Sequence, residues 1–213
     1  SNFAFHASQL GCNAYVISQV GRDSLGREIL SHLKFHGVQT RLISQDPLHP
    51  TGTVNITLNS RGEPAYLIRR PVAWDFIEFT PRILALASRV NAVCFGTLAQ
   101  RSPVSRQTIA RFIDACEPSC FRIYDINLRQ NYYTRTWVHQ SLRRSDALKL
   151  NHEEWPILAR LLNRQGSLQA LIRSLFESYG LKLVILTRGH LGSVLYTHTQ
   201  CSRHPGYSIR VKD

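Results

Sequence analysis

Asp125, Asn127 and Arg129 are the first residues of the sequence whose types and spacing suit ligand chemistry. They lie at the end of the apolar segment 121–126, which we predict to be a strand. Open α/β sheets bind their ligands at the carboxyl ends of strands, and a carboxylate, an amide and a guanidinium there suit a polar small molecule. A structural ion pair between Asp125 and Arg129 explains the same residues without any ligand.

Asn151 and Glu154 form a second group, at the end of a short apolar strand predicted at 147–151. A functional interpretation gives them a ligand at the carboxyl end of this strand. A structural interpretation makes them an ordinary helix start, because Asn is a good N-cap and the helix dipole favours carboxylates in the first turn. Glu154→Ala separates the two: the first predicts a loss of activity, the second a loss of about 1 kcal/mol of stability with turnover intact.

The segment 187–192 follows a third predicted strand and has the sequence Thr-Arg-Gly-His-Leu-Gly. Gly189 and Gly192 would let the backbone approach a phosphate after Thr187, although a lone Gly-x-x-Gly is usually a turn. The sequence has no P-loop, no dinucleotide-binding fingerprint and no nucleophile elbow. Polar residues at three successive strand ends carry more weight together than singly, and they predict a binding site along this edge of a sheet.

The elements that must position these residues alternate along most of the chain, which predicts an α/β fold with a mainly parallel sheet and helices on both faces. A helix at 3–10, a strand at 13–20 and a helix ending near Gly37 open the chain. After Pro71 the predicted strands are 91–95, 121–126, 147–151, 182–187, 192–197 and 208–211, and the predicted helices are 81–89, 102–116, 137–144, one from His152, and 168–179.

The segment from Thr51 to Ile68 has a different character. Polar and apolar residues alternate from Thr51 to Leu58, a turn follows, and a second strand begins at Ala65. This pattern predicts a β-hairpin with one apolar face. An isolated hairpin is only marginally stable, so we expect that face to lie against another surface.

The composition is that of an ordinary globular protein, with 43% hydrophobic and 19% charged residues among 213. No apolar run is long enough to span a membrane, so we expect no membrane partner. Five Cys without C-x-x-C spacing favour a reduced, cytoplasmic protein over a disulfide framework. His32 and His36 are four apart on a predicted helix, but nothing else completes a zinc signature.

The net charge of +12 raises the question of a nucleic-acid partner. Arg101, Arg106 and Arg111 recur every five residues, which spreads them around a helix instead of along one face. We therefore expect no nucleic-acid binding and interpret the charge as a solvated basic surface. A modest functional interpretation is the attraction of an anionic small substrate such as a nucleotide.

Short stretches along essentially the whole chain follow one another in the order of a known family. They are Asn2 to Ala7 with Leu10-Gly11, Val20 to Gly26, Gly37-Val38 with Thr40, Thr51 to Val54, Ala73 to Asp75, Phe95 to Leu98, Asp125 to Arg129, Lys149 to Asn151 with Glu154, and Thr187 to Gly189. In this order they resemble the ribokinase-like (PfkB) carbohydrate kinases, most closely the fructokinases. No single stretch is decisive, but the ordered set is specific.

The resemblance implies one ribokinase-like α/β domain over residues 1–213, with a doubly wound sheet. It makes the insertion at about 51–70 a small β-hairpin lid, through which two copies would form a homodimer. It also implies transfer of the γ-phosphoryl group of ATP to a sugar hydroxyl, with fructose as the expected sugar. ATP and Mg²⁺, with K⁺ as a further candidate, are the implied cofactors.

The resemblance also implies roles for individual residues. It places four residues at the sugar, namely Asn2, Asp125, Asn127 and Arg129. It places four at the nucleotide, namely Asn151, Thr187, Gly189 and Gly192. Glu154 would hold Mg²⁺ through water, and Asp213 is the candidate ligand of a monovalent cation.

The sequence also departs from the family pattern. A Gly-Gly should precede Asn2, and a Gly-Ala-Gly-Asp run should supply the catalytic base and an anion hole; neither is present. We therefore expect an incomplete domain truncated at both ends, with the base just beyond Asp213 and little kinase activity in these 213 residues alone. The alternative is a non-catalytic sugar- or nucleotide-binding or regulatory protein with the kinase fold.

Overall fold

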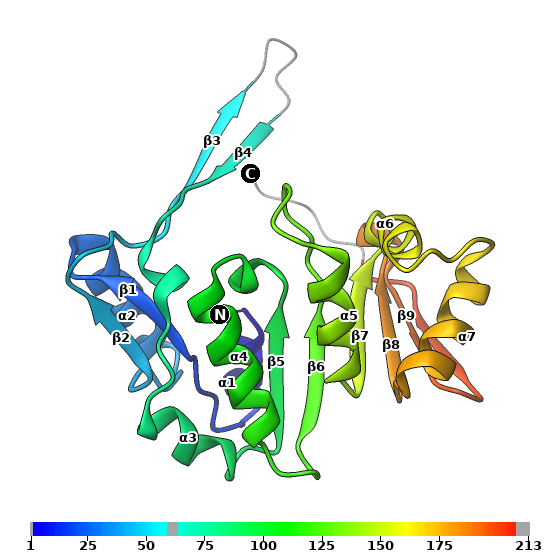
Figure 1. The fold of residues 1–213 in the computed structure, drawn as a ribbon, viewed down its shortest axis with the longest axis horizontal. Coiled ribbons are helices and arrows are strands. Elements are labelled where there is room, and N and C mark those ends of the chain that lie inside the picture. The colour runs from blue at the N-terminus through cyan, green and yellow to red at the C-terminus, as the bar shows by residue number, and fades with distance from the viewer. Residues whose placement is uncertain (1, 59–63, 208–213) are drawn as a thin grey trace. The chain divides into compact units, whose positions relative to one another are not determined.

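The chain forms two compact units, one of residues 1–86 with 102–112 and one of residues 87–101 with 113–213. The computed structural model describes residues 2–58 and 64–207 (Figure 1). No helix among these residues is long and apolar enough to cross a membrane.

A six-stranded sheet organises the second unit, with strands in the order β10-β9-β8-β7-β6-β5. The strands are β5 (Ala92–Gly96), β6 (Phe121–Asp125), β7 (Ala147–Asn151), β8 (Leu183–Thr187), β9 (Ser193–Tyr196) and β10 (Cys201–His204). Strands β5 to β8 are parallel, and β9 and β10 add an antiparallel edge. The predicted α/β class is confirmed.

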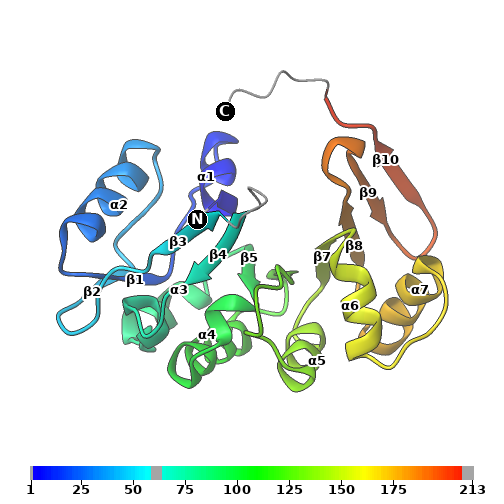
Figure 2. The same ribbon diagram turned by 90° about the horizontal axis from the view of Figure 1, so that it is seen from above.

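Three helices of this unit lie on one face of the sheet: α5 (Arg135–Arg143), α6 (Glu154–Leu161) and α7 (Leu168–Tyr179) (Figure 2). The alternation of side chains along each strand explains the packing. Tyr124, Leu148 and Val184 are fully buried, as is Leu175 of α7. On the alternate face, Ile123 and Ile185 are only half-buried.

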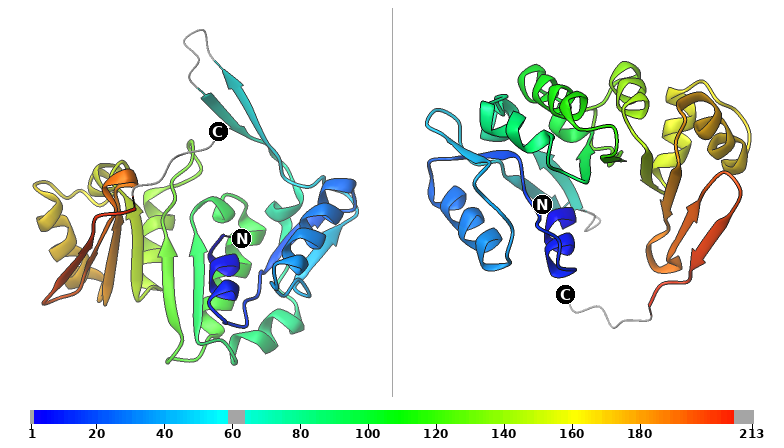
Figure 3. Two further views of the ribbon diagram at one scale, coloured as in Figure 1. Left: turned by 180° about the vertical axis from the view of Figure 1, so that it is seen from behind. Right: turned by 90° about the horizontal axis from the view of Figure 1, so that it is seen from below.

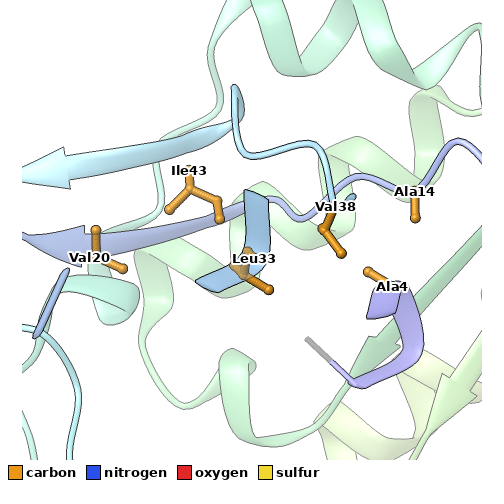
Figure 4. Close-up of a cluster of buried hydrophobic side chains, with 6 residues drawn as sticks. All are labelled: Ala4, Ala14, Val20, Leu33, Val38 and Ile43. Carbon is orange, nitrogen blue, oxygen red and sulfur yellow. The ribbon is translucent and has the colours of Figure 1, made fainter. Parts of the chain in front are cut away.

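The first unit contains a smaller parallel pair, β1 (Ser18–Gly21) and β2 (Ile43–Asp46). Its helices are α1 (Asn2–Gln9), α2 (Ser24–Phe35), α3 (Pro81–Ala87) and most of α4 (Pro103–Ala115). A cluster of aliphatic side chains joins α1 and α2 to the strands, comprising Ala4, Ala14, Val20, Leu33, Val38 and Ile43 (Figure 4).

Three short 3-10 turns complete the described chain. One, Ala73–Phe76, belongs to the first unit, and two, Leu98–Gln100 and Gly189–Leu191, belong to the second.

The predicted hairpin is present as β3 (Val54–Leu58) and β4 (Pro64–Ile68), which form a separate antiparallel sheet. It extends away from β1 and β2 within the first unit (Figure 3). The register places Val54, Ile56 and Tyr66 on one face, and all three side chains are more than half exposed. The role of the hairpin as a lid stays a prediction.

Two strands are absent from the prediction, β2 and β10. Strand β10 has the sequence Cys-Ser-Arg-His, and all four residues are exposed. It pairs through its backbone alone, so no apolar pattern marks it. The strand predicted at 13–20 begins only at Ser18, after an isolated bridge from Tyr15 to Gln39. The strand predicted at 208–211 lies outside the described residues.

A carboxylate ties the start of α2 to the segment that leads into the hairpin. One oxygen of Asp23 accepts from the Gly26 amide at 2.7 Å and from the Thr51 hydroxyl at 2.6 Å, and the other accepts from the Thr51 amide at 2.8 Å. These bonds, the Thr51 hydroxyl first, hold the pKa of Asp23 below its usual value. Asp23 is therefore both the N-cap of α2 and an anchor for the hairpin.

We expect Asp23→Asn to lower the free energy of unfolding at neutral pH by about 1–2 kcal/mol, because the new amide nitrogen faces the Thr51 N–H. Asp23 has a lowered pKa in the folded state, so its contribution is present above the unfolded-state pKa and is lost as pH falls through the folded-state value. Urea unfolding from neutral to acid pH measures the difference between the two proteins, which should shrink below about pH 4.

Glu28→Gln is the matched control, since it removes the same charge from an exposed position on the same helix. Equal destabilisation by both substitutions would show that Asp23 contributes only through net charge.

Candidate functional site

The carboxyl ends of β6, β7 and β8 lie side by side in the second unit (Figure 1). Asp125 of β6 is in register with Lys149 of β7, and Asn151 of β7 is in register with Thr187 of β8. The structure therefore brings the three predicted groups of polar residues to one edge of one sheet.

Glu154, the first residue of α6, joins two of these strand ends. Its side chain is buried, with 5% exposed. One carboxylate oxygen accepts from the Leu128 amide and the other from the Asn151 amide, both at 2.8 Å. The Asn151 side-chain oxygen accepts in turn from the amides of Glu153 and Glu154, at 2.8 and 2.9 Å.

Asn151 and Glu154 therefore do lie at a helix start, but the prediction of Asn151 as the N-cap is wrong: α6 begins at Glu154, not at His152, and its N-cap is Glu153. The Asn151 side chain caps the turn that precedes the helix. A carboxylate has about four lone-pair positions. One amide on each oxygen therefore leaves an acceptor position on each for a water molecule. The two interpretations are compatible in geometry.

Asp125 forms an ion pair with Lys149, with 3.0 Å between Oδ1 and Nζ. The alternative partner, Arg129, instead donates from Nη1 to the Leu128 carbonyl at 3.0 Å. Sequence reasoning missed Lys149 as a site residue. Its signal was its place two residues before Asn151, which puts both side chains on the same face of β7.

Asn127 adopts a left-handed backbone conformation, with φ of 37°. Asn accepts this region more readily than most residues, because its short polar side chain can satisfy local hydrogen bonds. The conformation turns the chain after Ile126, whose amide still donates to the Lys149 carbonyl at 3.0 Å. Asn127 therefore begins the loop that Glu154 then fixes at Leu128.

The two glycines of the turn after β8, both predicted to approach a phosphate, have different surroundings. A Cβ on Gly189 would meet nothing within 4 Å, whereas one on Gly192 would clash with the His204 carbonyl oxygen. Gly192 is therefore needed for the approach of the chain at 204–206, and Gly189 borders open space. Arg188, also missed from sequence, donates from Nη2 to the Leu191 carbonyl, while its buried Nε has no hydrogen-bond partner among residues 2–58 and 64–207.

Cys94 of β5 lies on the same face of the sheet as Asp125 and Lys149. Burial, aided by the negative charge of Asp125, raises the pKa of the Cys94 thiol to about 11. A thiol with this pKa stays protonated near neutral pH and is a poor nucleophile. The site therefore offers hydrogen bonds and charge, not covalent catalysis by cysteine.

Two predicted site residues remain, Asn2 and Asp213. Asn2 is exposed at the start of α1 in the other unit, and Asp213 lies outside the described residues. Within residues 2–58 and 64–207, no three His, Cys, Asp or Glu side chains cluster as ligands of a metal ion.

We expect Glu154→Gln to lower the free energy of unfolding by about 1–3 kcal/mol, because the new amide group places a donor against a backbone N–H. Urea denaturation followed by circular dichroism measures the loss. Glu153→Gln, an exposed neighbour with the same change of charge, should leave stability within about 0.5 kcal/mol of the parent. Equal stability of Glu154→Gln and the parent would show that the two hydrogen bonds of Glu154 to backbone amides do not stabilise the fold.

Comparison with known proteins gives one consistent result. The family of pfkB carbohydrate kinases matches residues 1–213. Fructokinase from Escherichia coli is 27% identical over 220 residues, covering the whole of this chain and 70% of that protein. The ATP-dependent 6-phosphofructokinase of Thermoanaerobacterium thermosaccharolyticum is 25% identical, covering 92% of this chain and 60% of that protein.

Solved structures agree on the fold. Fructokinase with bound ATP from Xylella fastidiosa superposes with a TM-score of 0.86 at 19% identity, covering 100% of this chain and 66% of that one. The fructose, ADP and calcium complex of fructokinase from Vibrio cholerae O395 gives 0.79 at 21% identity, covering 98% and 68%. This chain thus spans about two thirds of the proteins that it matches. It belongs to the pfkB family of carbohydrate kinases.

Proposed function

We propose that the protein is an ATP-dependent kinase that phosphorylates a hydroxyl group of a sugar, with fructose as its preferred substrate. The observation that carries this proposal is the row of polar groups at the carboxyl ends of β6, β7 and β8 in a chain of this family. Support for fructose comes from relatives named fructokinase, among them the one from Escherichia coli.

ATP fits the residues at the end of β8. Phosphoryl transfer needs positive charge and hydrogen-bond donors around the phosphates. Arg188 supplies a guanidinium with one unpartnered, buried nitrogen, and the open space beside Gly189 leaves room for a phosphate near the backbone. Thr187 and Asn151 lie in register next to them. We assign four residues to nucleotide binding: Asn151, Thr187, Arg188 and Gly189. Gly192 contributes by allowing the turn after β8 to form.

Mg²⁺ fits Glu154 through water. Both carboxylate oxygens already accept a backbone amide, so an indirect role suits this side chain better than direct coordination. Mg²⁺ usually keeps several waters and binds through one or two carboxylates plus substrate phosphates. Bound there, the ion would neutralise charge on the transferred group.

The sugar is assigned to Asp125, Asn127 and Arg129, and a sugar role for Asn2 stays a prediction from the sequence. Asp125 forms an ion pair with Lys149, and its carboxylate oxygens are acceptors suited to sugar hydroxyls. Asn127 contributes an amide at the turn, and the exposed Arg129 lies on the same loop. The cytoplasmic location of the protein stays a prediction from the sequence. Binding of K⁺ through Asp213 also stays a prediction.

The whole protein should form ADP from ATP only when Mg²⁺ and a sugar are both present, fastest with fructose. A coupled assay with a panel of hexoses, pentoses and fructose 6-phosphate measures the preference, and the expected turnover is about 1–100 per second. ATP binding without turnover on any sugar would favour the non-catalytic alternative. A faster reaction with another sugar would contradict the proposed preference for fructose but not the proposed kinase activity.

The role of Glu154 at the metal is tested in the same assay. Below the temperature at which Glu154→Gln unfolds, this variant should need at least about tenfold more Mg²⁺ for half-maximal rate, because the ion loses a charged partner for its water shell. If Glu154→Gln loses stability but needs no more Mg²⁺ than the parent, Glu154 has a structural role at the helix start and no role at the metal.

The exposed apolar face of the β3–β4 hairpin supports assembly of two copies through their hairpins. Val54, Ile56 and Tyr66 expose between 53% and 61% of their surface. Such exposure on a protruding hairpin is typical of a surface that another surface covers.

Ile56→Asp should convert a dimer of the whole protein into monomers, because it buries a charge in the contact. Sedimentation velocity gives the mass. Asn55→Asp adds the same charge to the other face of β3 and should keep the dimer. A monomeric parent protein, or loss of the dimer in both variants, would exclude assembly through this face.

A further inference from the structure

The outer surface of the second unit carries a polar pair that the proposed kinase site does not use. His139 of α5 and Tyr179, the last residue of α7, are linked by 2.6 Å between Nδ1 and the hydroxyl oxygen. Both side chains are half-buried. Tyr179 lies four residues before β8 begins, which places the pair toward the amino ends of the parallel strands, away from the carboxyl ends that carry the proposed site.

Three guanidinium groups surround this pair. Arg135 and Arg143 lie four residues before and after His139. One face of α5 therefore carries these two arginines and the histidine. Arg164 comes from the segment between α6 and α7 and donates to the Ser178 hydroxyl at 2.9 Å. The charges of all three arginines act on both His139 and Tyr179.

None of these three arginines has a carboxylate partner among residues 2–58 and 64–207. The neighbouring residue shows the usual arrangement, since Arg144 forms an ion pair with Asp114 at 2.8 Å. The positive charge around His139 is therefore not neutralised by the chain that the structure describes.

The local sequence of α5 also opposes this arrangement. Arg135 is the first residue of the helix, where the dipole favours negative charge, and the first turn contains no acidic residue. Arg135 therefore works against its own helix, whereas Arg143 lies in the last turn, where the dipole favours positive charge. A residue that opposes its helix beside two further arginines without carboxylate partners among the described residues points to a ligand.

We propose that Arg135, His139, Arg143, Arg164 and Tyr179 form a binding site for a small phosphate-type oxyanion. Guanidinium groups bind tetrahedral oxyanions through paired N–H donors, and the tyrosine hydroxyl and imidazole add further donors. The charges converge on one imidazole. An extended polyanion such as duplex DNA would need a longer line of basic residues.

The imidazole couples this site to pH. Burial and the three arginines lower the pKa of His139, so the free protein holds it neutral near pH 7. The groups facing it are Arg135 and Arg143 on its own helix, Arg164 and Tyr179; burial raises the pKa of Tyr179, which keeps its proton. A bound dianion offsets the arginine charge and raises the pKa of His139. Binding therefore takes up a proton, and affinity rises as pH falls between the free and bound values.

Calorimetric titration of the protein with pyrophosphate at low ionic strength tests the site. Replacing both arginines of α5, Arg135→Gln with Arg143→Gln, should weaken binding by about tenfold or more, because two charge-assisted contacts are lost. The double variant Arg89→Gln with Arg173→Gln removes the same net charge from exposed positions elsewhere, and its affinity should stay within about twofold of the parent.

Sulfate provides the pH test, because it does not titrate in the relevant range. Sulfate should bind more tightly at about pH 6 than at about pH 8, and the C–H resonances of His139 should show a higher pKa when it is present. His139→Gln should remove this pH dependence but retain binding near pH 8. Sugar kinase activity at saturating ATP should be unchanged in all these variants.

Three results would overturn the proposal. One is an equal loss of pyrophosphate affinity in the two double variants, which would show a general charge effect. Another is loss of binding with Arg188→Gln alone, which would place the anion at the proposed nucleotide site. The third is a His139 pKa that sulfate leaves unchanged.

Discussion

The buried carboxylate of Glu154 is the interaction on which the functional edge of the sheet depends. A buried charge is tolerated only when hydrogen bonds satisfy it, and this one accepts from the amides of Leu128 and Asn151. The two bonds fix the loop after β6, the end of β7 and the first turn of α6 against one another. Asp146 has the same role at the opposite edge, where it accepts from the Arg122 amide and pairs with Lys182. The parallel strands are thus held at both ends by single acidic residues.

This arrangement explains how a helix start and the proposed nucleotide site can share Asn151. A helix start needs acceptors for free amides, and a nucleotide with Mg²⁺ needs polar groups held rigidly at a strand end. The same side chains meet both needs, because each carboxylate oxygen of Glu154 uses only part of its acceptor capacity. The choice between a structural and a functional role, which the sequence posed as alternatives, is not forced by the geometry.

The sequence predicted the parallel strands well, because β6, β7 and β8 are mainly apolar segments, buried or half-buried, that end in polar residues. It did not predict β10, whose residues are all exposed, or β2, whose two middle residues are exposed. At the site, the strand ends were predictable but their partners were not. The pairing of Asp125 with Lys149 depends on the register between two strands that are distant in sequence. The need for Gly192 comes from the backbone at His204, a contact that no local pattern contains.

The same distinction applies to the net charge of +12, which the composition presents as a uniform excess. In the structure some basic residues complete ion pairs, as Arg144 does with Asp114 and Lys149 with Asp125. Others gather where the described chain offers no carboxylate, as around His139. Pairing neutralises the first kind locally, so the long-range field comes from the second kind. For a protein of a family that acts on phosphates, the location of unpaired arginines is therefore more informative than the sum of charges.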